Sequence, residues 1–396
     1  MESYPIPVTN RYARKRQRNP ENWKKNVMKK LSPKTDVCSV CLQLTEKIKA
    51  EQDNGKKNEL ITEKRIHSLR AKAFFEKLRE QCEGLITISF DFQKNLPLPK
   101  LPDQITYYSR QLYFFNLTMV VGSSNDSLGK DRVFAYCCTE NQFNKDSNLV
   151  ASAVYHRLTH IDKTGIRNIR LVADGCGGQN KNCIVLGACS KWLLENQNIS
   201  SIELVFPVTG HSYMPADRQF GIIEKKIRKM DTIVHPDEIT DVISETSTII
   251  KLGSDCPVKD WRSSVKSVVK DTTSWPMKFK ECKRFILKRS KKEGNVLIRG
   301  ELFYKSDVGK AVNVCQKHKN IAMIVPQTMS DIKALNKNKL QDVKMLLKKH
   351  FGDDWVDIPT LSFYNDVLSS QSELPAPSHE TNYCDEVLVE TSDLRV

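Results

Sequence analysis

The chain lacks several features that would place it in common protein classes. It has no stretch near the roughly 18 consecutive apolar residues that a membrane-spanning helix requires, so we expect no membrane segment. It has no apolar secretion signal near its first residue, which favours an intracellular location. It also has no internal repeats, no Walker phosphate loop, no dinucleotide-binding glycine motif and no serine-hydrolase nucleophile elbow. The sequence therefore does not predict nucleotide-dependent or serine-hydrolase chemistry.

Cysteine is present, but not in the pattern of a disulfide framework. The chain has twelve cysteines without regular pairing, so we expect reduced thiols, most of them buried as small apolar side chains. One pair stands out because Cys38 and Cys41 are separated by two residues, the spacing that presents two thiolates to a tetrahedral zinc ion. His67, beyond the first predicted helix, is the expected third ligand, and Cys82 is a candidate for the fourth. Two ordinary cysteines remain the alternative reading.

Basic residues exceed acidic ones throughout the chain. Its 396 residues include 62 Lys and Arg against 47 Asp and Glu, a formal net charge of +15. Such an excess favours a polyanionic partner, because lysine and arginine gain affinity by displacing counterions from phosphates. We therefore expect a nucleic-acid partner, most simply DNA, although a basic surface that only keeps the protein soluble is the alternative.

The two ends of the chain differ in charge. Residues 1–36 hold ten Lys and Arg against three acids, and we predict a disordered basic arm. The cluster at residues 14–18 has the composition of a nuclear-localisation signal or a phosphate-binding arm, so we expect a nuclear protein, or otherwise a cytoplasmic one. Residues 368–396 hold six acids and one arginine, which predicts a disordered acidic tail.

Three segments lie between these ends. Residues 37–83 are helical in composition, and a break at residues 54–55 suggests a helical hairpin. Residues 84–235 alternate apolar strands with helices, which predicts a mixed sheet flanked by helices and an α/β fold. Residues 236–367 form a mixed C-terminal region. The predicted strands are 84–92, 106–121, 132–139, 168–173, 201–208, 284–287, 296–299 and 321–325, and the predicted helices are 148–160 with Ser147 as N-cap, 183–196, 217–230, 237–252 and 337–350.

Acids in three of these segments carry the main functional expectation. Asp91 and Asp174 each follow an apolar strand, and a third segment supplies Asp217 and Glu224, seven residues apart on one predicted helix. Carboxylates at neighbouring strand ends can meet around Mg²⁺ or Mn²⁺, which prefer oxygen ligands. We expect one of the two helix acids to complete the set, with a slight preference for Glu224. An ordinary turn or cap is the alternative for each acid alone.

Polar and basic residues near these acids suit a phosphodiester substrate. Two cations about 4 Å apart would activate a water or a 3′-hydroxyl and stabilise the leaving oxygen. His211 is a candidate proton shuttle or additional ligand, or else an ordinary turn histidine. The glycines after Asp174 would let a ligand approach the backbone. Candidate nucleic-acid contacts, which would otherwise form a solvated surface, are Gln179, Asn180, Lys181, Arg218, Lys225, Lys226 and Arg228.

These motifs together resemble a large uncharacterised animal family that carries a domain of unknown function. The resemblance covers roughly residues 34–365 and rests on FDFQKN at 90–95, DGCGGQNKN at 174–182, GHSYMPAD at 210–217 and IEK at 223–225. The family looks like an offshoot of mobile-element transposases with a ribonuclease H-like core. The resemblance implies that Asp91, Asp174 and one of Asp217 and Glu224 are the acids of such nucleases. It also favours zinc at the cysteine pair.

The chain departs from that family in one respect. Family members are expected to have a longer segment between the basic stretch and the cysteine pair, which suggests a truncated member here. We therefore expect a transposase-derived protein with metal-dependent phosphodiester cleavage or transfer as its ancestral activity. The competing expectation is a protein that keeps the same fold and binds nucleic acid but catalyses no reaction. A third expectation is a protein-interaction module.

Overall fold

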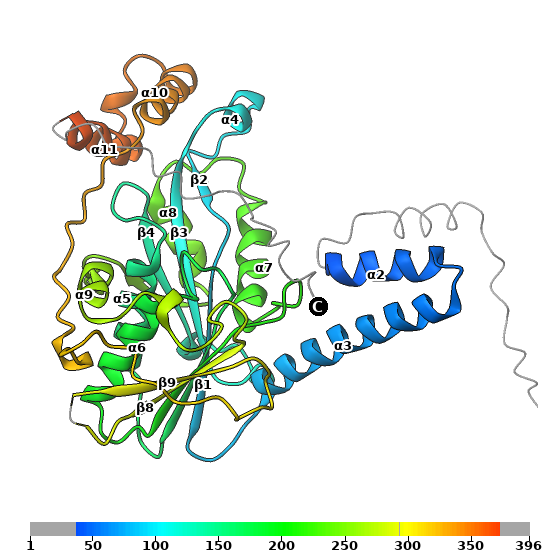
Figure 1. Cartoon of the computed structure of the whole chain (residues 1–396). Helices are drawn as coiled ribbons and strands as arrows, with labels where there is room; N and C mark the ends of the chain where they lie inside the picture. Colours follow the sequence, from blue (N-terminus) through cyan, green and yellow to red (C-terminus); the bar gives the residue numbers. More distant parts are fainter. Residues whose placement is uncertain (1–36, 293, 373–396) are drawn as a thin grey trace, which may run out of the picture. The chain divides into compact units, whose positions relative to one another are not determined.

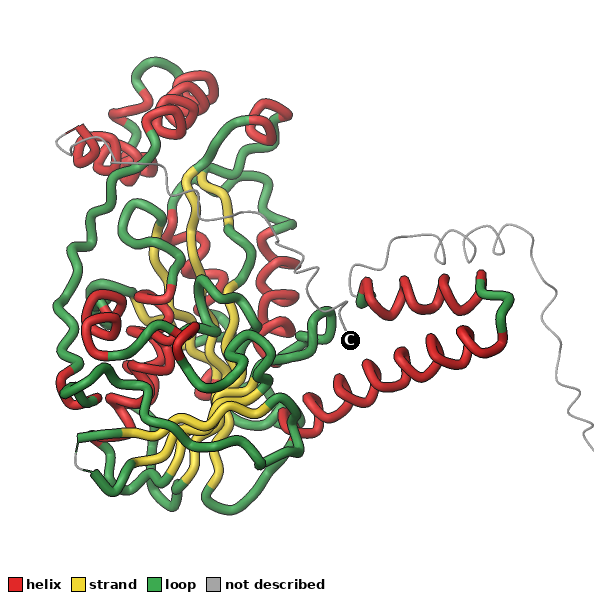
Figure 2. The backbone as a smooth tube through the Cα atoms, in the orientation of Figure 1, coloured by secondary structure: helices red, strands yellow, loops and turns green. Residues whose placement is uncertain are grey.

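The computed structural model describes residues 37–292 and 294–372 (Figures 1 and 2). The predicted basic arm and most of the predicted acidic tail lie outside the described residues. The chain divides into two compact units, Met1–Lys64 and Arg65–Val396. No helix in the described part of the chain is long and apolar enough to cross a bilayer. All cysteines in that part are free thiols.

The described part of the first unit is helical. Helix α2 spans Ser39–Ala50, and helix α3 spans Asn54–Arg79, so that α3 starts in the first unit and continues into the second. The side chain of Asp53 accepts a hydrogen bond from the Lys56 amide over 2.7 Å, which satisfies one of the free donors at the start of α3. The predicted interruption is confirmed, but it lies at residues 51–53, just before the predicted position.

The second unit is built on a mixed sheet of nine strands in the described residues (Figure 2). Its strand order is β7-β4-β3-β1-β5-β6-β8-β9, and β2 pairs with β3 outside this path. Strand β3 is antiparallel to its neighbours β1 and β4, β5 and β6 run parallel to β1, and the edge strand β7 runs parallel to β4. The bounds are β1 Leu85–Phe92, β2 Leu96–Leu98, β3 Leu112–Val121, β4 Val133–Thr139, β5 Asn168–Val172, β6 Ser201–Val205, β7 Thr248–Lys251, β8 Arg284–Arg289 and β9 Val296–Glu301.

Helices cover both faces of this sheet (Figure 1). Helices α5, α6 and α9 pack together on one face, while α7 and α8 contact strands β1, β3, β4 and β7 on the other. Alternation along β1 explains the layers, because Ile88 and Phe90 are buried in the core beneath α5 and α6 while Ser89 and Asp91 face the opposite side. The bounds are α4 Gln104–Tyr108, α5 Ser147–Thr159, α6 Cys183–Glu195, α7 Pro215–Ile227, α8 Pro236–Ser244, α9 Trp261–Val268, α10 Lys337–Phe351 and α11 Ser362–Ser372.

Four local predictions are corrected by the structure. The strand predicted from residue 106 begins at Leu112, because Asp103 accepts a hydrogen bond from the Ile105 amide and starts α4 instead. The helix predicted to reach residue 252 ends at Ser244. The β-branched residues that follow it pair with the edge of β4 as β7. The N-cap of α5 is Asp146 rather than Ser147.

The fourth correction concerns residues 321–325, which were predicted as a strand. They contain a 3₁₀ turn, Ile321–Met323, and both Ile321 and Ile324, the residue that follows the turn, are fully buried. A spacing of three between buried residues fits one turn of a tight helix better than the alternation of a strand. The other 3₁₀ turns of the described chain are Lys130–Arg132, Thr272–Ser274, Trp355–Asp357 and Pro359–Leu361.

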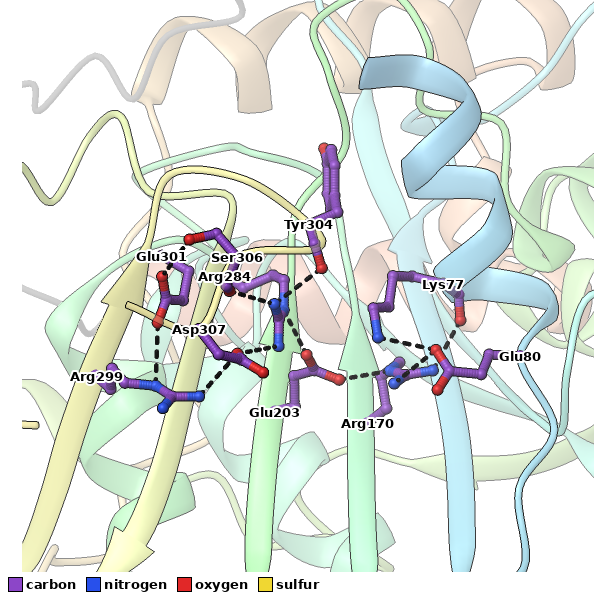
Figure 3. A network of polar contacts seen from close by, with 10 residues as sticks. All are labelled: Lys77, Glu80, Arg170, Glu203, Arg284, Arg299, Glu301, Tyr304, Ser306 and Asp307. Atoms are coloured by element: carbon purple, nitrogen blue, oxygen red, sulfur yellow. Dashed lines mark hydrogen bonds and ion pairs between the residues drawn. The ribbon is translucent and has the colours of Figure 1, made fainter. Parts of the chain in front are cut away.

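A ladder of alternating charges crosses the α3 side of the sheet (Figure 3). Glu203 on β6 accepts hydrogen bonds from Arg170 on β5 and from Arg284 on β8, each over 2.6 Å. Burial alone would raise the pKa of Glu203, but the two guanidinium groups hold that pKa below its usual value. The ladder is electrically balanced, with Lys77, Arg170, Arg284 and Arg299 opposite Glu80, Glu203, Glu301 and Asp307.

The ladder fixes the C-terminal half of α3 to the sheet. Arg170 donates to the Lys77 carbonyl over 2.9 Å and lies 3.2 Å from Glu80. Phe74 and Leu78 of the same helix are buried against Val172 and Val205, which lie on the same face of the sheet. Sequence analysis missed the ladder, although a single charged residue within each apolar strand, such as Arg170 between Ile169 and Leu171, was its signal.

Candidate metal sites

Two of the predicted acids lie side by side at one edge of the sheet. Strand β5 pairs with β1 from Leu85 opposite Asn168 to Ser89 opposite Val172. Each β5 residue therefore comes 83 positions after its β1 partner. Asp174 comes 83 positions after Asp91, so both acids continue this register where the two parallel strands end. Because side chains alternate along a strand, Asp91 and Asp174 project to the same face of the sheet.

Asp217 is the third acid of this group. It lies in the first turn of α7, the helix that contacts β1, and its Oδ2 accepts a hydrogen bond from the Met214 amide over 2.7 Å. Burial raises the pKa of Asp91 well above its usual value, and the charges of Asp174 and Asp217 raise it further. Like charges have this effect at short range, so Asp174 and Asp217 lie near Asp91, although the three acids do not form a group of closely converging ligand atoms among the described residues.

Glu224, the preferred third acid at the sequence level, has a different environment. Its carboxylate lies 3.1 Å from Nζ of Lys94, so its charge is paired with that lysine. Glu224 also lies two helical turns beyond Asp217 along α7. The geometry therefore favours Asp217 over Glu224 as the partner of Asp91 and Asp174.

Buried polar atoms of Asn180, which contacts Asp174, and of two residues close to the acids in sequence have no hydrogen-bond partner among the described residues. Asn180 donates from Nδ2 to Oδ1 of Asp174, while its own Oδ1 is buried and unpartnered. Oγ of Ser89, on the same face of β1 as Asp91, and Oε1 of Gln219 on α7 are also buried and unpartnered. Buried polar groups are ordinarily satisfied by protein, water or an ion. The region is therefore suited to hold ordered water or a hydrated cation.

The glycine-rich loop after Asp174 borders open space. A Cβ added at Gly175, Gly177 or Gly178 would meet no atom within 4 Å, so packing against other residues does not require these glycines. The space beside the loop backbone is thus open at these three positions. The loop then leads into α6, whose first amides are capped by the side chain of Asn182.

The predicted nucleic-acid contacts have varied environments. Asn180 is buried and bonded to Asp174, which makes it part of the acid region rather than the surface. Arg218 donates to the Ser124 carbonyl over 3.2 Å, and Lys226 pairs with Glu245. The remaining candidates keep at least part of their side chains accessible, with Lys225 and Arg228 exposed and Gln179 and Lys181 half-buried.

His211 lies against His67 of α3. Their Nε2 atoms are 3.0 Å apart, and the ring centroids are 4.9 Å apart. Burial lowers the pKa of His211, which favours the neutral imidazole that binds metals. Sequence analysis did not anticipate this contact, because 144 positions separate the two residues and no short spacing signals their approach.

The two histidines and the predicted cysteine pair form a group that could hold a metal ion such as zinc. The ligand atoms of Cys38, Cys41, His67 and His211 all lie within 4.8 Å of one another. Burial raises the pKa of Cys41, and its neighbour Cys38 raises it further. Two sulfur and two imidazole ligands are a common set for tetrahedral zinc. Within residues 37–292 and 294–372, no other group of three or more such side chains meets this spacing.

Comparison with known proteins identifies one region of the chain. A DUF7869 domain, a domain of unknown function, spans residues 117–299. The DUF7869 region runs from β3 to β9 and contains Asp174, Asp217 and His211, whereas Asp91 and the cysteine pair precede it. No curated protein and no solved structure matches the chain. Because DUF7869 has no assigned function, the match attributes no activity to the chain.

Proposed function

We propose that this protein derives from a transposase and that Asp91, Asp174 and Asp217 form its centre for metal-dependent phosphodiester cleavage or transfer. The observation that carries the proposal is that Asp91 and Asp174 continue the register of the adjacent parallel strands β1 and β5, with the charge of Asp217 acting on Asp91. Three acids from separate parts of a chain seldom meet by packing alone, because each pays a desolvation cost and repels the others.

Each acid would have a distinct task. Asp91 and Asp174, fixed at the ends of β1 and β5, would hold cations from one side, and Asp217 on α7 would close the opposite side. The amide of Asn180 would fix the orientation of the Asp174 carboxylate. Bound Mg²⁺ or Mn²⁺ would lower the pKa of the attacking water or hydroxyl group and would stabilise the negative charge on the leaving oxygen. Exposed Lys225 and Arg228 would contact the phosphate backbone.

The topology supports a ribonuclease H-like core as part of this proposal. Three antiparallel strands, β1, β3 and β4, form one side of the sheet, and β5 and β6 extend it in parallel from β1. This arrangement follows the element order expected at the sequence level from residues 84–235. We further propose that the four-ligand group binds Zn²⁺ in a structural role, since all four tetrahedral positions would be filled by protein.

A nicking assay tests the activity. Supercoiled DNA is incubated with Mn²⁺ and the full-length protein or its Asp174→Asn variant. We expect the substitution to lower the nicking rate by about 100-fold or more, because a metal-ligand carboxylate is lost. Asp162→Asn is the matched control, since Asp162 is an exposed acid that accepts a hydrogen bond from the Thr164 amide in a turn. Equal nicking by the wild type and Asp174→Asn would exclude the proposed centre.

Nucleic-acid binding without turnover is the second candidate function. It is favoured by the fact that protein donors already occupy positions on all three acids, with the Phe92 amide on Asp91, the Met214 amide on Asp217, and the Cys176 amide and Asn180 on Asp174. A protein of this kind would bind DNA with the salt dependence of a basic surface but would show no Mn²⁺-dependent nicking in the same assay.

A further inference from the structure

The short helix α4 displays two large aromatic side chains to solvent. Tyr107 is 83% exposed and Tyr108 is 76% exposed. The rings lie edge to face with centroids 5.1 Å apart. Folding ordinarily leaves few tyrosines so open, because their rings gain free energy when apolar surface is buried. Two adjacent exposed rings therefore indicate a surface that a partner covers.

Ion pairs hold this helix against α10, as the adjacent positions of α4 and α10 in Figure 1 also show. Asp103, the N-cap of α4, lies 3.1 Å from both Lys349 and His350. Beyond the other end of the helix, Nε of Arg110 donates to Asp342 over 2.8 Å. The tyrosines and the exposed side of α10 thus belong to one surface, which we call the tyrosine–lysine surface.

This surface is strongly basic. The exposed cations of residues 100–111 and 337–351 are Arg110, Lys337, Lys344, Lys348 and Lys349, against two acids, Asp103 and Asp342. Lys100 and Lys339 are instead bonded within the protein. Lys348 and Arg110 are each more than half exposed even within their ion pairs. Clustered cations attract a polyanion, and the attraction is released by salt.

We propose that the tyrosine–lysine surface binds single-stranded nucleic acid, with unpaired bases stacked on Tyr107 and Tyr108 and phosphates beside the lysines of α10. Exposed aromatic rings within a basic surface have the two components that sequence-tolerant single-strand binders use. Paired bases in a duplex expose only their edges and cannot stack on these rings. A protein partner would gain less from the positive charge. The inference rests on the proposed nucleic-acid function and names a substrate contact remote from the acids.

Affinity measurements on single-stranded DNA test the inference apart from catalysis. A fluorescently labelled thymidine oligonucleotide is titrated with full-length protein in EDTA, so that no metal-dependent cleavage contributes. We expect Tyr107→Ala and Tyr108→Ala each to weaken binding by at least about fivefold, because one stacked base is lost. Tyr107→Phe and Tyr108→Phe, which keep the ring, should bind within about twofold of the wild type.

Matched controls make the result specific. Phe303→Ala removes another half-exposed ring, at a position that follows β9, and should leave affinity unchanged. A labelled duplex of the same length should respond less to the tyrosine substitutions than the single strand. Unchanged single-strand affinity in both alanine variants, an equal loss on duplex, or no single-strand binding by the wild type would each overturn the inference. Failure of the proposed catalytic centre would instead appear as absence of nicking with binding intact.

Discussion

Asp91 near the end of β1 and Asp174, two residues beyond β5, continue the register of these adjacent parallel strands, and alternation places both on the same face of the sheet. Burial and the neighbouring acids hold the pKa of Asp91 well above its usual value, which disfavours its ionised form relative to that of an exposed aspartate. Such a site binds a divalent cation in competition with protons. This relationship underlies the proposed chemistry and the choice of the third acid.

Asp217, rather than Glu224, should be required for Mn²⁺ binding. Asp217→Asn removes a charge that acts on Asp91, whereas Glu224→Gln removes one that is paired with Lys94. We expect Asp217→Asn to weaken Mn²⁺ binding by about 10-fold or more and Glu224→Gln by less than about twofold. Electron paramagnetic resonance of free Mn²⁺ measures both affinities. A larger loss in Glu224→Gln would reverse the assignment made from the geometry.

Zinc content should depend on His211 as much as on the cysteines. Removing one of four ligands opens the tetrahedral site and lowers its affinity. We expect purified wild type to contain about one zinc per chain, and Cys38→Ser and His211→Ala to contain much less. Mass spectrometry of metal content gives the stoichiometry. Cys82→Ser is the control, since Cys82 is an exposed thiol outside the group, and full zinc in His211→Ala would show that this histidine is not a ligand.

Glu203→Gln should destabilise the protein through the charge ladder. The substitution leaves Arg170 and Arg284, both almost fully buried, without their shared carboxylate. Uncompensated buried charge costs about 3–5 kcal/mol, and the retained amide oxygen places our expectation near the lower limit. Chemical denaturation measures the change in free energy of unfolding. Glu281→Gln is the control, because Glu281 forms an exposed ion pair with Lys278. We expect the control to change the free energy of unfolding by less than about 0.5 kcal/mol. An equal effect of both substitutions would refute the role of the ladder.

His156 should make the fold sensitive to mild acid. Burial lowers its pKa from 6.5 to about 4, with help from the charges of His160 and Arg157. Between these values the unfolded chain binds a proton that the folded protein excludes, so stability should fall as pH decreases from 6.5 towards 4. His156→Asn keeps an acceptor for the Tyr136 hydroxyl, which lies 3.0 Å from Nδ1, but removes this titration. Thermal melting at several pH values should therefore show a shallower decline in the variant, and identical slopes would refute the prediction.

Much of the sheet and the position of two acids could be predicted from the sequence, because short apolar runs followed by an acid are a local signal. Strands β1, β5 and β6 lie where the runs before Asp91, Asp174 and His211 predicted strands. Strand β7 could not be predicted in the same way. Thr248–Lys251 is extended because it pairs with β4 residues more than one hundred positions away, a tertiary effect that overrides the helical pattern before it.

The details of the metal sites also depend on tertiary contacts. The choice between Asp217 and Glu224 was open in the sequence because both lie on one side of a helix, and the position of Lys94 beside Glu224 distinguishes them. His67 was a candidate ligand through its proximity to the cysteine pair in sequence. His211 enters the group only because the chain returns after β6.

Anomalous diffraction from crystals grown with Mn²⁺ would test the central claim most directly. The account predicts manganese density between the carboxylates of Asp91 and Asp174, on the side that faces Asp217, and its loss in Asp174→Asn crystals. Manganese density elsewhere only, or carboxylates of Asp91 and Asp174 that remain metal-free at saturating Mn²⁺, would contradict it.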